Sequence, residues 1–110
     1  MNESFLHYIW QFQYFDKTDL RCTTGEEVVV INPGFHNKDA GPDFYNAKVR
    51  LEEMEWAGSV EIHIQSSGWQ EHKHQDDAAY ENVVLHVVWE ENETILRRDG
   101  TVLPTIELRN

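Results

Sequence analysis

The sequence predicts a single α+β domain that contains more strand than helix. Apolar residues recur at helical spacing in one segment near the N-terminus, from about Ser4 to Phe15. Later segments show the alternation or the β-branched runs that are typical of strands, and turn residues separate them. A length of 110 residues is enough for one domain with one hydrophobic core.

The first predicted element is the N-terminal helix. Phe5, Ile9 and Phe12 lie on one face at helical spacing. Asn2 or Ser4 stands where a helix N-cap is needed, and both residue types accept a hydrogen bond from the first turn. We therefore expect a helix whose apolar face packs against the rest of the domain.

Three strands follow, and a fourth comes later. The β-branched run Glu27 to Ile31 stops at an Asn-Pro-Gly turn, and Phe44 to Leu51 alternates between apolar and polar residues. After a turn at Glu52-Glu53, the segment Glu55 to Gln65 alternates again. The almost continuously apolar run Val83 to Trp89 suits a central strand buried on both faces.

The remaining segments are less regular. Trp69 to Glu81 is polar and rich in histidine, and we expect an irregular crossover with a short helix near Asp77 to Glu81. Thr94 to Leu96 and Thr105 to Leu108 flank an Arg-Asp-Gly turn, so we expect them to form a hairpin at the edge of the sheet.

Composition excludes several classes of protein. The formal net charge of -11 argues against a domain that binds nucleic acid or a membrane surface unaided. No apolar stretch approaches the roughly 20 residues that span a bilayer. The single cysteine, Cys22, excludes an intrachain disulfide and a cysteine-based zinc cluster, and it fits a reducing compartment. We expect a cytoplasmic protein with no membrane partner.

Two acids are predicted to converge. Asp43 begins one strand and Glu61 lies in the middle of the next, and the turn between those strands falls near their midpoint. Paired carboxylates repel each other unless a proton or a cation lies between them, and oxygen ligands suit Mg²⁺ or Mn²⁺. The alternative is that Asp43 only completes a turn and that Glu61 lies on a solvated face.

The strand that carries Glu61 has three successive polar positions on one face, formed by Glu61, His63 and Gln65. Such a face is costly if it is covered and left unpaired. It is therefore either open to water or part of the lining of a cleft, where His63 is a candidate catalytic residue and Gln65 an auxiliary one.

Histidines provide an alternative metal site. His72 and His74 form an H-x-H pair, and imidazole suits Zn, Fe, Ni or Mn. The alternative is that these side chains only form hydrogen bonds within a loop. His86, inside the apolar strand, is expected to be a core histidine whose hydrogen bonds are satisfied.

Several strings resemble an uncharacterised bacterial family, domain of unknown function 2851. The resemblance covers nearly the whole chain, and it implies that residues 1–110 are one domain, the N-terminal part of a longer architecture. The strings are Asn2-Glu3-Ser4-Phe5-Leu6-His7-Tyr8-Ile9-Trp10, Asn32-Pro33-Gly34-Phe35-His36-Asn37, Asp39-Ala40-Gly41-Pro42-Asp43-Phe44, Trp56-Ala57-Gly58-Ser59-Val60-Glu61-Ile62-His63, and the series Trp69, His72, His74, Tyr80, Leu85-His86-Val87-Val88.

The order of elements also resembles, more distantly, the PD-(D/E)XK nucleases, which have a restriction-endonuclease-like fold. That resemblance implies Mg²⁺ or Mn²⁺ held by Asp43 and Glu61, with His63 in the place of the usual lysine. It also suggests Lys48 as a migrated catalytic lysine and Glu3 as an auxiliary acid. The implied activity is phosphodiester hydrolysis in nucleic acid.

Three functions therefore follow as hypotheses. The first is a divalent-metal-dependent, nuclease-like domain that reaches nucleic acid with help from a basic partner or a further region. The second is a non-catalytic interaction or scaffold domain with a degenerate metal site, and a homo-oligomer is also left open. The third is a transition-metal site at His72 and His74.

Overall fold

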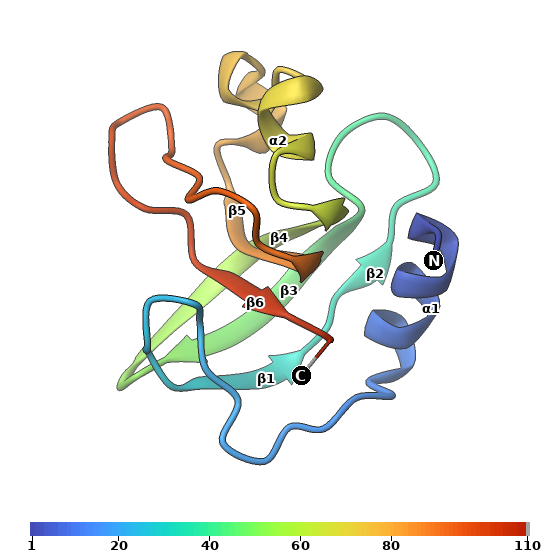
Figure 1. The fold of residues 1–110 in the computed structure, drawn as a ribbon, viewed down its shortest axis with the longest axis vertical. Helices are drawn as coiled ribbons and strands as arrows, with labels where there is room; N and C mark the ends of the chain where they lie inside the picture. The colour runs from blue at the N-terminus through green and yellow to red at the C-terminus, as the bar shows by residue number, and fades with distance from the viewer. Residues whose placement is uncertain (110) are drawn as a thin grey trace.

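The computed structural model describes residues 1–109 as a mixed sheet with a helix beside it (Figure 1). The sheet has six strands, and the hydrogen-bonded order is β1-β3-β4-β5-β6, with β2 paired to β3. The elements are α1 (Glu3–Phe12), β1 (Val28–Asn32), β2 (Phe35–His36), β3 (Phe44–Leu51), β4 (Met54–Gln65), α2 (Gly68–Glu71), β5 (Val83–Glu90) and β6 (Thr105–Glu107). The predicted α+β class is confirmed.

Helix α1 begins and ends where local chemistry requires. The Oδ1 atom of Asn2 accepts a hydrogen bond from the backbone N–H of Phe5 at 2.9 Å, as predicted for the N-cap. The helix stops three residues earlier than expected because Gln13 adopts a left-handed conformation. Leu6 and Trp10 are fully buried against the sheet.

Three antiparallel strands form the first half of the sheet. β3 pairs with β1 on one side and with β4 on the other, so the predicted meander is confirmed. The structure adds the two-residue strand β2, which pairs with the start of β3. Phe44 lies opposite Val60, and this register brings the start of β3 to the middle of β4.

The connection from β4 to β5 is a crossover, and β5 then runs parallel to β4. It contains α2 and two short 3₁₀ turns, His74–Asp76 and Ala78–Tyr80. Figure 1 shows these pieces gathered at one end of the sheet. The first six residues of β5 are buried, as predicted for a central strand.

The predicted edge hairpin is wrong. Between Thr94 and Leu96 the structure has only one isolated bridge, from Leu96 to Val102. β6 instead runs parallel to β5, with Val87 opposite Ile106. The Arg-Asp-Gly turn closes a small loop, and the chain then returns to the open edge of β5.

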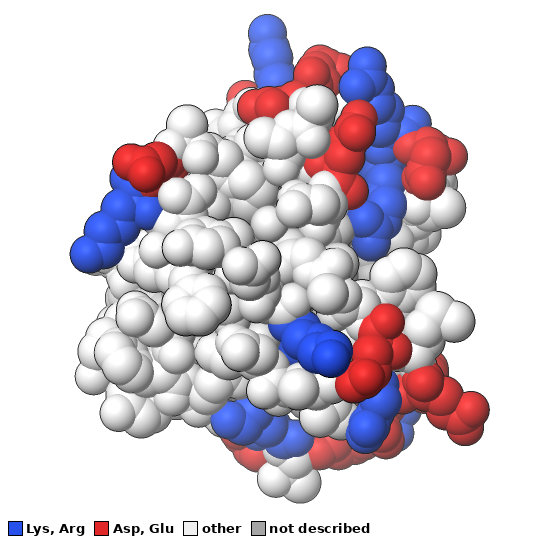
Figure 2. Space-filling view, turned by 180° about the vertical axis from the view of Figure 1, so that it is seen from behind, with Lys and Arg blue, Asp and Glu red and all other residues white. Residues whose placement is uncertain are grey.

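The core has two parts. Most buried apolar residues lie between α1 and the sheet, while Trp69, Val83, Ile95 and Leu103 form a smaller cluster beside the crossover. Figure 2 shows, from behind, a broad area without charged side chains, and charges mainly along the upper and lower right margins. Over residues 1–109, no helix is long and apolar enough to cross a membrane.

Candidate metal centre

Asp43 and Glu61 lie side by side across the β3–β4 pair. The backbone N–H of Asp43 donates to Oε1 of Glu61 at 3.1 Å, and the N–H of Ile62 donates to Oδ2 of Asp43 at 2.8 Å. Each carboxyl group therefore accepts a hydrogen bond from the backbone of the other segment. The second oxygen of Glu61, Oε2, contacts other side chains.

Those partners are histidines from β4 and the crossover. Nε2 of His74 lies 2.8 Å from Oε2 of Glu61, and Nε2 of His63 lies 3.4 Å from it. The His74 contact is close, but His74 Nε2 is buried and does not direct an N–H hydrogen bond at any described acceptor. Glu61, His63 and His74 are all buried, so water does not satisfy them freely.

His63 is oriented by a second histidine. Its Nδ1 lies 2.7 Å from Nε2 of His86, which β5 presents next to Glu61 in the parallel register. When His63 Nδ1–H donates in this bond, its Nε2 carries the lone pair and faces Glu61. An imidazole fixed in this way through its other nitrogen is a common feature of metal ligands.

The predicted role of His86 is only half right. His86 is fully buried and one of its nitrogens is bonded, but Nδ1 has no hydrogen-bond partner among the described residues. A core histidine chosen only for packing would leave no such group. Its contact with Nδ1 of His63 at 2.7 Å fixes the orientation of that ring.

His72 completes the cluster. Its Nδ1 lies 3.3 Å from Nε2 of His63, and one ligand atom from each of His63, His72 and His74 lies within 4.8 Å of the other two. Two metal–ligand bonds of about 2.0–2.1 Å at a tetrahedral angle place their ligand atoms about 3.3–3.4 Å apart. The separations from His63 to His72 and to Glu61 match this spacing.

The start of α2 allows the cluster to be this close. A Cβ atom on Gly68 would lie 2.6 Å from Cδ2 of His63 and 2.8 Å from its Cγ. Only glycine leaves room for the crossover to pass over the imidazole. The crossover then carries His72 and His74 back to the same point of the sheet.

The protonation states of Glu61, His63 and His74 are compatible with a site that releases a proton when it binds a cation. Burial, then the charge of Asp43, raises the pKa of Glu61 to about 10. Burial lowers the pKa of His63 to about 3 and that of His74 to about 4, and neighbouring histidines add to both shifts. Near neutral pH, Glu61 is therefore protonated and both imidazoles are uncharged.

Sequence reasoning missed His7. Its Nε2 lies 3.5 Å from Oδ2 of Asp43, and this hydrogen bond raises the pKa of His7. Burial acts to raise the pKa of Asp43, but the hydrogen bond and charge of His7 hold it below its usual value. The sequence could have indicated His7 as a candidate, because it is a polar residue next to the apolar face of α1.

The structure places the other predicted site residues differently. Glu3 lines a cavity together with His63 and His72, and its role as an auxiliary acid stays a prediction. Gln65 lines the same cavity, but its amide donates to Glu90 at 3.0 Å. Lys48 is exposed opposite Ala57, several residues down β3 from Asp43, and the structure does not bring it to the cluster.

The cavity in front of the cluster has a volume of about 430 Å³. His72, which is exposed, gives the cluster an open side toward it. Glu3, Glu71 and Glu90 also line this cavity, so its charge attracts cations and repels phosphates. An ion can therefore enter from solvent past His72.

The polar face that carries Glu61 and His63 is covered by the crossover. Both residues are buried, so the alternative in which this face is open to water is wrong. The same burial removes the reading in which Glu61 lies on a solvated face.

Comparison with known proteins identifies one family. No curated protein and no solved structure showed a significant match to the chain. The family described as protein of unknown function (DUF2851) matches residues 3–110, which is almost the full length. The chain belongs to the DUF2851 family.

Proposed function

We propose that this domain binds a divalent transition-metal ion through Glu61, His63, His72 and His74. The single observation that carries the proposal is that one ligand nitrogen from each of His63, His72 and His74 lies within 4.8 Å of the other two. Oε2 of Glu61 lies beside two of them, 3.4 Å from Nε2 of His63 and 2.8 Å from Nε2 of His74. Three imidazoles and one carboxylate favour Zn²⁺ and related ions over Mg²⁺. The separation of 2.8 Å between His74 and Glu61 would need to widen by about 0.5 Å to match tetrahedral spacing.

The chemistry of the donors supports this ion class. A metal ligand must be deprotonated, and His63 and His74 are already neutral near pH 7. His74 Nε2 is buried without a hydrogen bond of its own, which is costly unless something occupies it. The hydrogen bond between Nδ1 of His63 and Nε2 of His86 holds the ring of His63 in place.

The test is calorimetric titration of the purified domain with Zn²⁺, Mn²⁺ and Mg²⁺, together with visible absorption after Co²⁺ loading. We expect one Zn²⁺ site and a tetrahedral Co²⁺ spectrum. Substituting exposed His72 (His72→Ala) should weaken Zn²⁺ binding at least tenfold, whereas the matched control His36→Gln should leave it unchanged. No Zn²⁺ or Co²⁺ binding by the wild-type domain would overturn the proposal.

A second variant separates this centre from an Mg²⁺ site at the acid pair. Asp43 raises the pKa of Glu61 through its charge, so Asp43→Asn should make Glu61 easier to ionise. Zn²⁺ affinity at pH 7 should then be unchanged or higher. Loss of binding in Asp43→Asn would instead show that the ion sits between the two carboxylates.

A nuclease-like activity is the second candidate, and it is supported by the order of the elements. A helix, an antiparallel meander, a crossover and a parallel fourth strand follow one another, with Asp43 just before β3 and Glu61 in β4. A bound metal supplies a water of lowered pKa for hydrolysis at phosphorus. The acidic cavity then requires a basic partner or a further region to hold nucleic acid.

Incubation of the metal-loaded domain with single- and double-stranded DNA and RNA tests this second function. Cleavage that is lost in Glu61→Gln would support it. If the loaded wild type cleaves none of the four substrates, hydrolysis by this domain is refuted and metal binding is untouched.

A further inference from the structure

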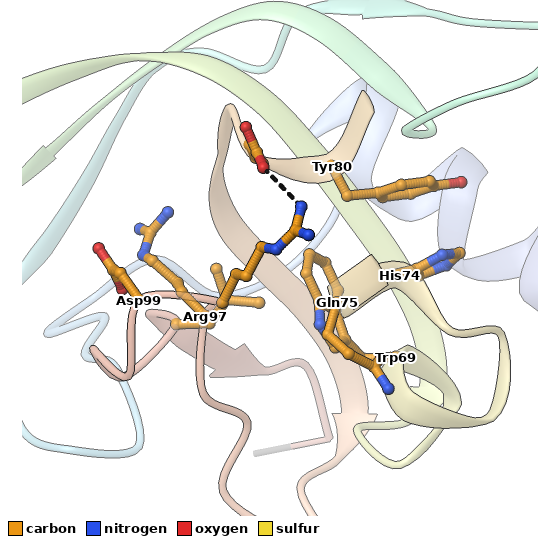
Figure 3. A pocket seen from close by; sticks show the side chains of 9 residues that line it. Trp69, His74, Gln75, Tyr80, Arg97 and Asp99 are labelled. Atoms are coloured by element: carbon orange, nitrogen blue, oxygen red, sulfur yellow. Dashed lines mark hydrogen bonds and ion pairs between the residues drawn. The ribbon is translucent and has the colours of Figure 1, made fainter. Parts of the chain in front are cut away.

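A second cavity lies on the other side of His74. It has a volume of about 340 Å³ and opens between the crossover and the loop that precedes β6. Figure 3 shows Arg97 and Asp99 on one side of it, and Trp69, His74 and Tyr80 on the other. The size falls at the lower end of the range for small-molecule sites, which is roughly 300–1,000 Å³.

One wall of this cavity is aromatic and rigid. Tyr80 stacks on His74, with ring centroids 3.7 Å apart and an interplanar angle of 14°. Trp69 meets the Tyr80 ring edge to face at 5.8 Å. With Leu103, these side chains offer flat apolar surfaces of the kind against which a planar ring packs.

Two polar atoms on the residues that line the cavity have no partner. Nε1 of Trp69 and Oε1 of Gln75 are buried, and neither has a hydrogen bond to any described residue. Trp69 as a whole is only 3% exposed. A buried N–H without an acceptor costs about 1–3 kcal/mol, and a ligand acceptor would remove that cost.

The opposite wall carries two guanidinium groups, Arg97 and Arg98, beside the acids Asp99 and Glu81. Nη1 of Arg97 donates to the carbonyl of Val83 at 2.8 Å, which fixes the guanidinium, and burial lowers the pKa of Arg97. Within residues 1–109 no acid forms an ion pair with Arg97, and Asp99 accepts its hydrogen bonds from Thr101. A partly desolvated guanidinium of this kind favours an anionic ligand.

Arg98 supports the same preference. It pairs with Glu81 at 3.3 Å, but both side chains are more than half exposed. An exposed pair of this kind contributes little, so Arg98 can turn toward a ligand at small cost. The domain is strongly acidic, yet two adjacent guanidinium groups line this cavity.

We infer that the cavity between Trp69, Tyr80 and Arg97 binds a small aromatic anion. The planar ring packs against the aromatic wall, and a carboxylate or phosphate group lies at Arg97 and Arg98. This site differs from the metal centre, although His74 lies between the two, and it requires no metal. Its ligand class is independent of the function proposed above.

The test uses the metal-free protein in EDTA, so that its result does not depend on the metal centre. Two-dimensional ¹H–¹⁵N NMR follows the indole N–H of Trp69, which is assigned by its loss in Trp69→Phe. The probes are 5′-AMP and 4-hydroxybenzoate, which combine a ring with an anion. Adenosine lacks the anion and ribose 5-phosphate lacks the aromatic ring.

We expect at least one of the two aromatic anions to shift the Trp69 signal, while adenosine and ribose 5-phosphate do not at the same concentration. A response to 5′-AMP alone identifies phosphate as the anion, and a response to 4-hydroxybenzoate alone identifies carboxylate. If neither probe shifts the signal, or if adenosine binds as well as 5′-AMP, the inference is overturned.

Variants test the wall that carries the two guanidinium groups. Arg97→Gln and Arg98→Gln should each weaken binding several-fold, and the first at least tenfold, whereas the exposed strand residue changed in Arg50→Gln should have no effect. Because Arg97 also holds the carbonyl of Val83, its variant is checked for folding by the same spectra. If it does not fold, Arg98→Gln alone decides, and unchanged binding by that variant contradicts the inference.

Discussion

The residue that limits how closely the metal centre can be assembled is Gly68. A methyl group there would overlap the ring of His63, because the built Cβ lies 2.6 Å from Cδ2 of that ring. We predict that Gly68→Ala displaces His63 and weakens Zn²⁺ binding at least tenfold, or about 1.4 kcal/mol. Calorimetric titration measures the loss.

The control is Gln70→Ala, an exposed position in the same short helix, which should bind Zn²⁺ like the wild type. Circular dichroism of both variants establishes that the fold is retained. A folded Gly68→Ala with wild-type affinity would show that His63 is not a ligand in the proposed geometry.

Glu61 makes a second prediction at the residue scale. Its pKa is raised to about 10, so at pH 7 it carries a proton that it must lose to bind a cation. We expect Zn²⁺ binding at pH 7 to release about one proton from this group. Calorimetry in buffers of different ionisation enthalpy counts the protons, and a count near zero in every buffer would contradict the assignment.

Residue-level prediction succeeded where secondary structure fixed the distance. Asp43 and Glu61 are at similar distances from the turn between β3 and β4, and this was enough to predict that they lie close together. In an antiparallel pair, the register relates separation in sequence to proximity in space. His72 and His74 were identified by type, but their position depends on an irregular crossover. Sequence pattern alone does not predict that this segment packs over His63. The proximity of Glu61 to the crossover histidines was therefore not predicted.

At the scale of elements, the contact between β4 and the crossover depends on Gly58. A Cβ on Gly58 would collide with the backbone oxygen of Asn82, just before β5. We predict that Gly58→Ala lowers the free energy of unfolding by about 1–3 kcal/mol, as overpacking does. Urea denaturation measures this change, and the exposed neighbour in Ala57→Ser should stay within about 0.5 kcal/mol of wild type.

The edge of the sheet shows why element prediction failed there. Thr94 to Leu96 and Thr105 to Leu108 looked like two arms of a hairpin, because an Arg-Asp-Gly turn separates them. A turn predicts that the chain reverses direction, but it does not determine which strand the following segment pairs with. Val87 and His86 leave an open edge on β5, and β6 satisfies those backbone groups by pairing in parallel.

At the scale of the whole molecule, the acidity is not evenly placed. The net charge of -11 was read as evidence against nucleic-acid binding by the domain alone, and the acidic cavity in front of His72 is consistent with that reading. Two arginines nevertheless line the second cavity. The net charge therefore describes only the average surface: three acids line the first cavity, whereas two arginines beside Glu81 and Asp99 line the second.

The last prediction concerns how the stability of the metal-free domain depends on pH. Burial lowers the pKa values of His63 and His74 to about 3 and 4, so the unfolded chain binds more protons than the native state below pH 6.5. Stability is then lost as the pH falls from 6.5 toward 4. Glu61 acts in the opposite sense, because its native pKa is raised to about 10 and it keeps a proton that the unfolded chain releases above pH 4.5.

Between pH 4.5 and 6.5 the buried histidines, to which His86 with its lowered pKa also belongs, outweigh Glu61. Above pH 6.5 stability is lost through Glu61 and, near neutral pH, through His7, whose pKa is raised. The free energy of unfolding should therefore peak near neutral pH and fall toward pH 9, by about 1.4 kcal/mol per pH unit from Glu61 alone. Urea denaturation in EDTA at pH 5, 6.5 and 8.5 measures this profile. Glu61→Gln should reduce the alkaline decline, because the variant lacks the Glu61 proton and keeps only the contribution of His7. A wild-type stability that rises from pH 6.5 to 8.5 would mean that Glu61 is ionised in the native domain.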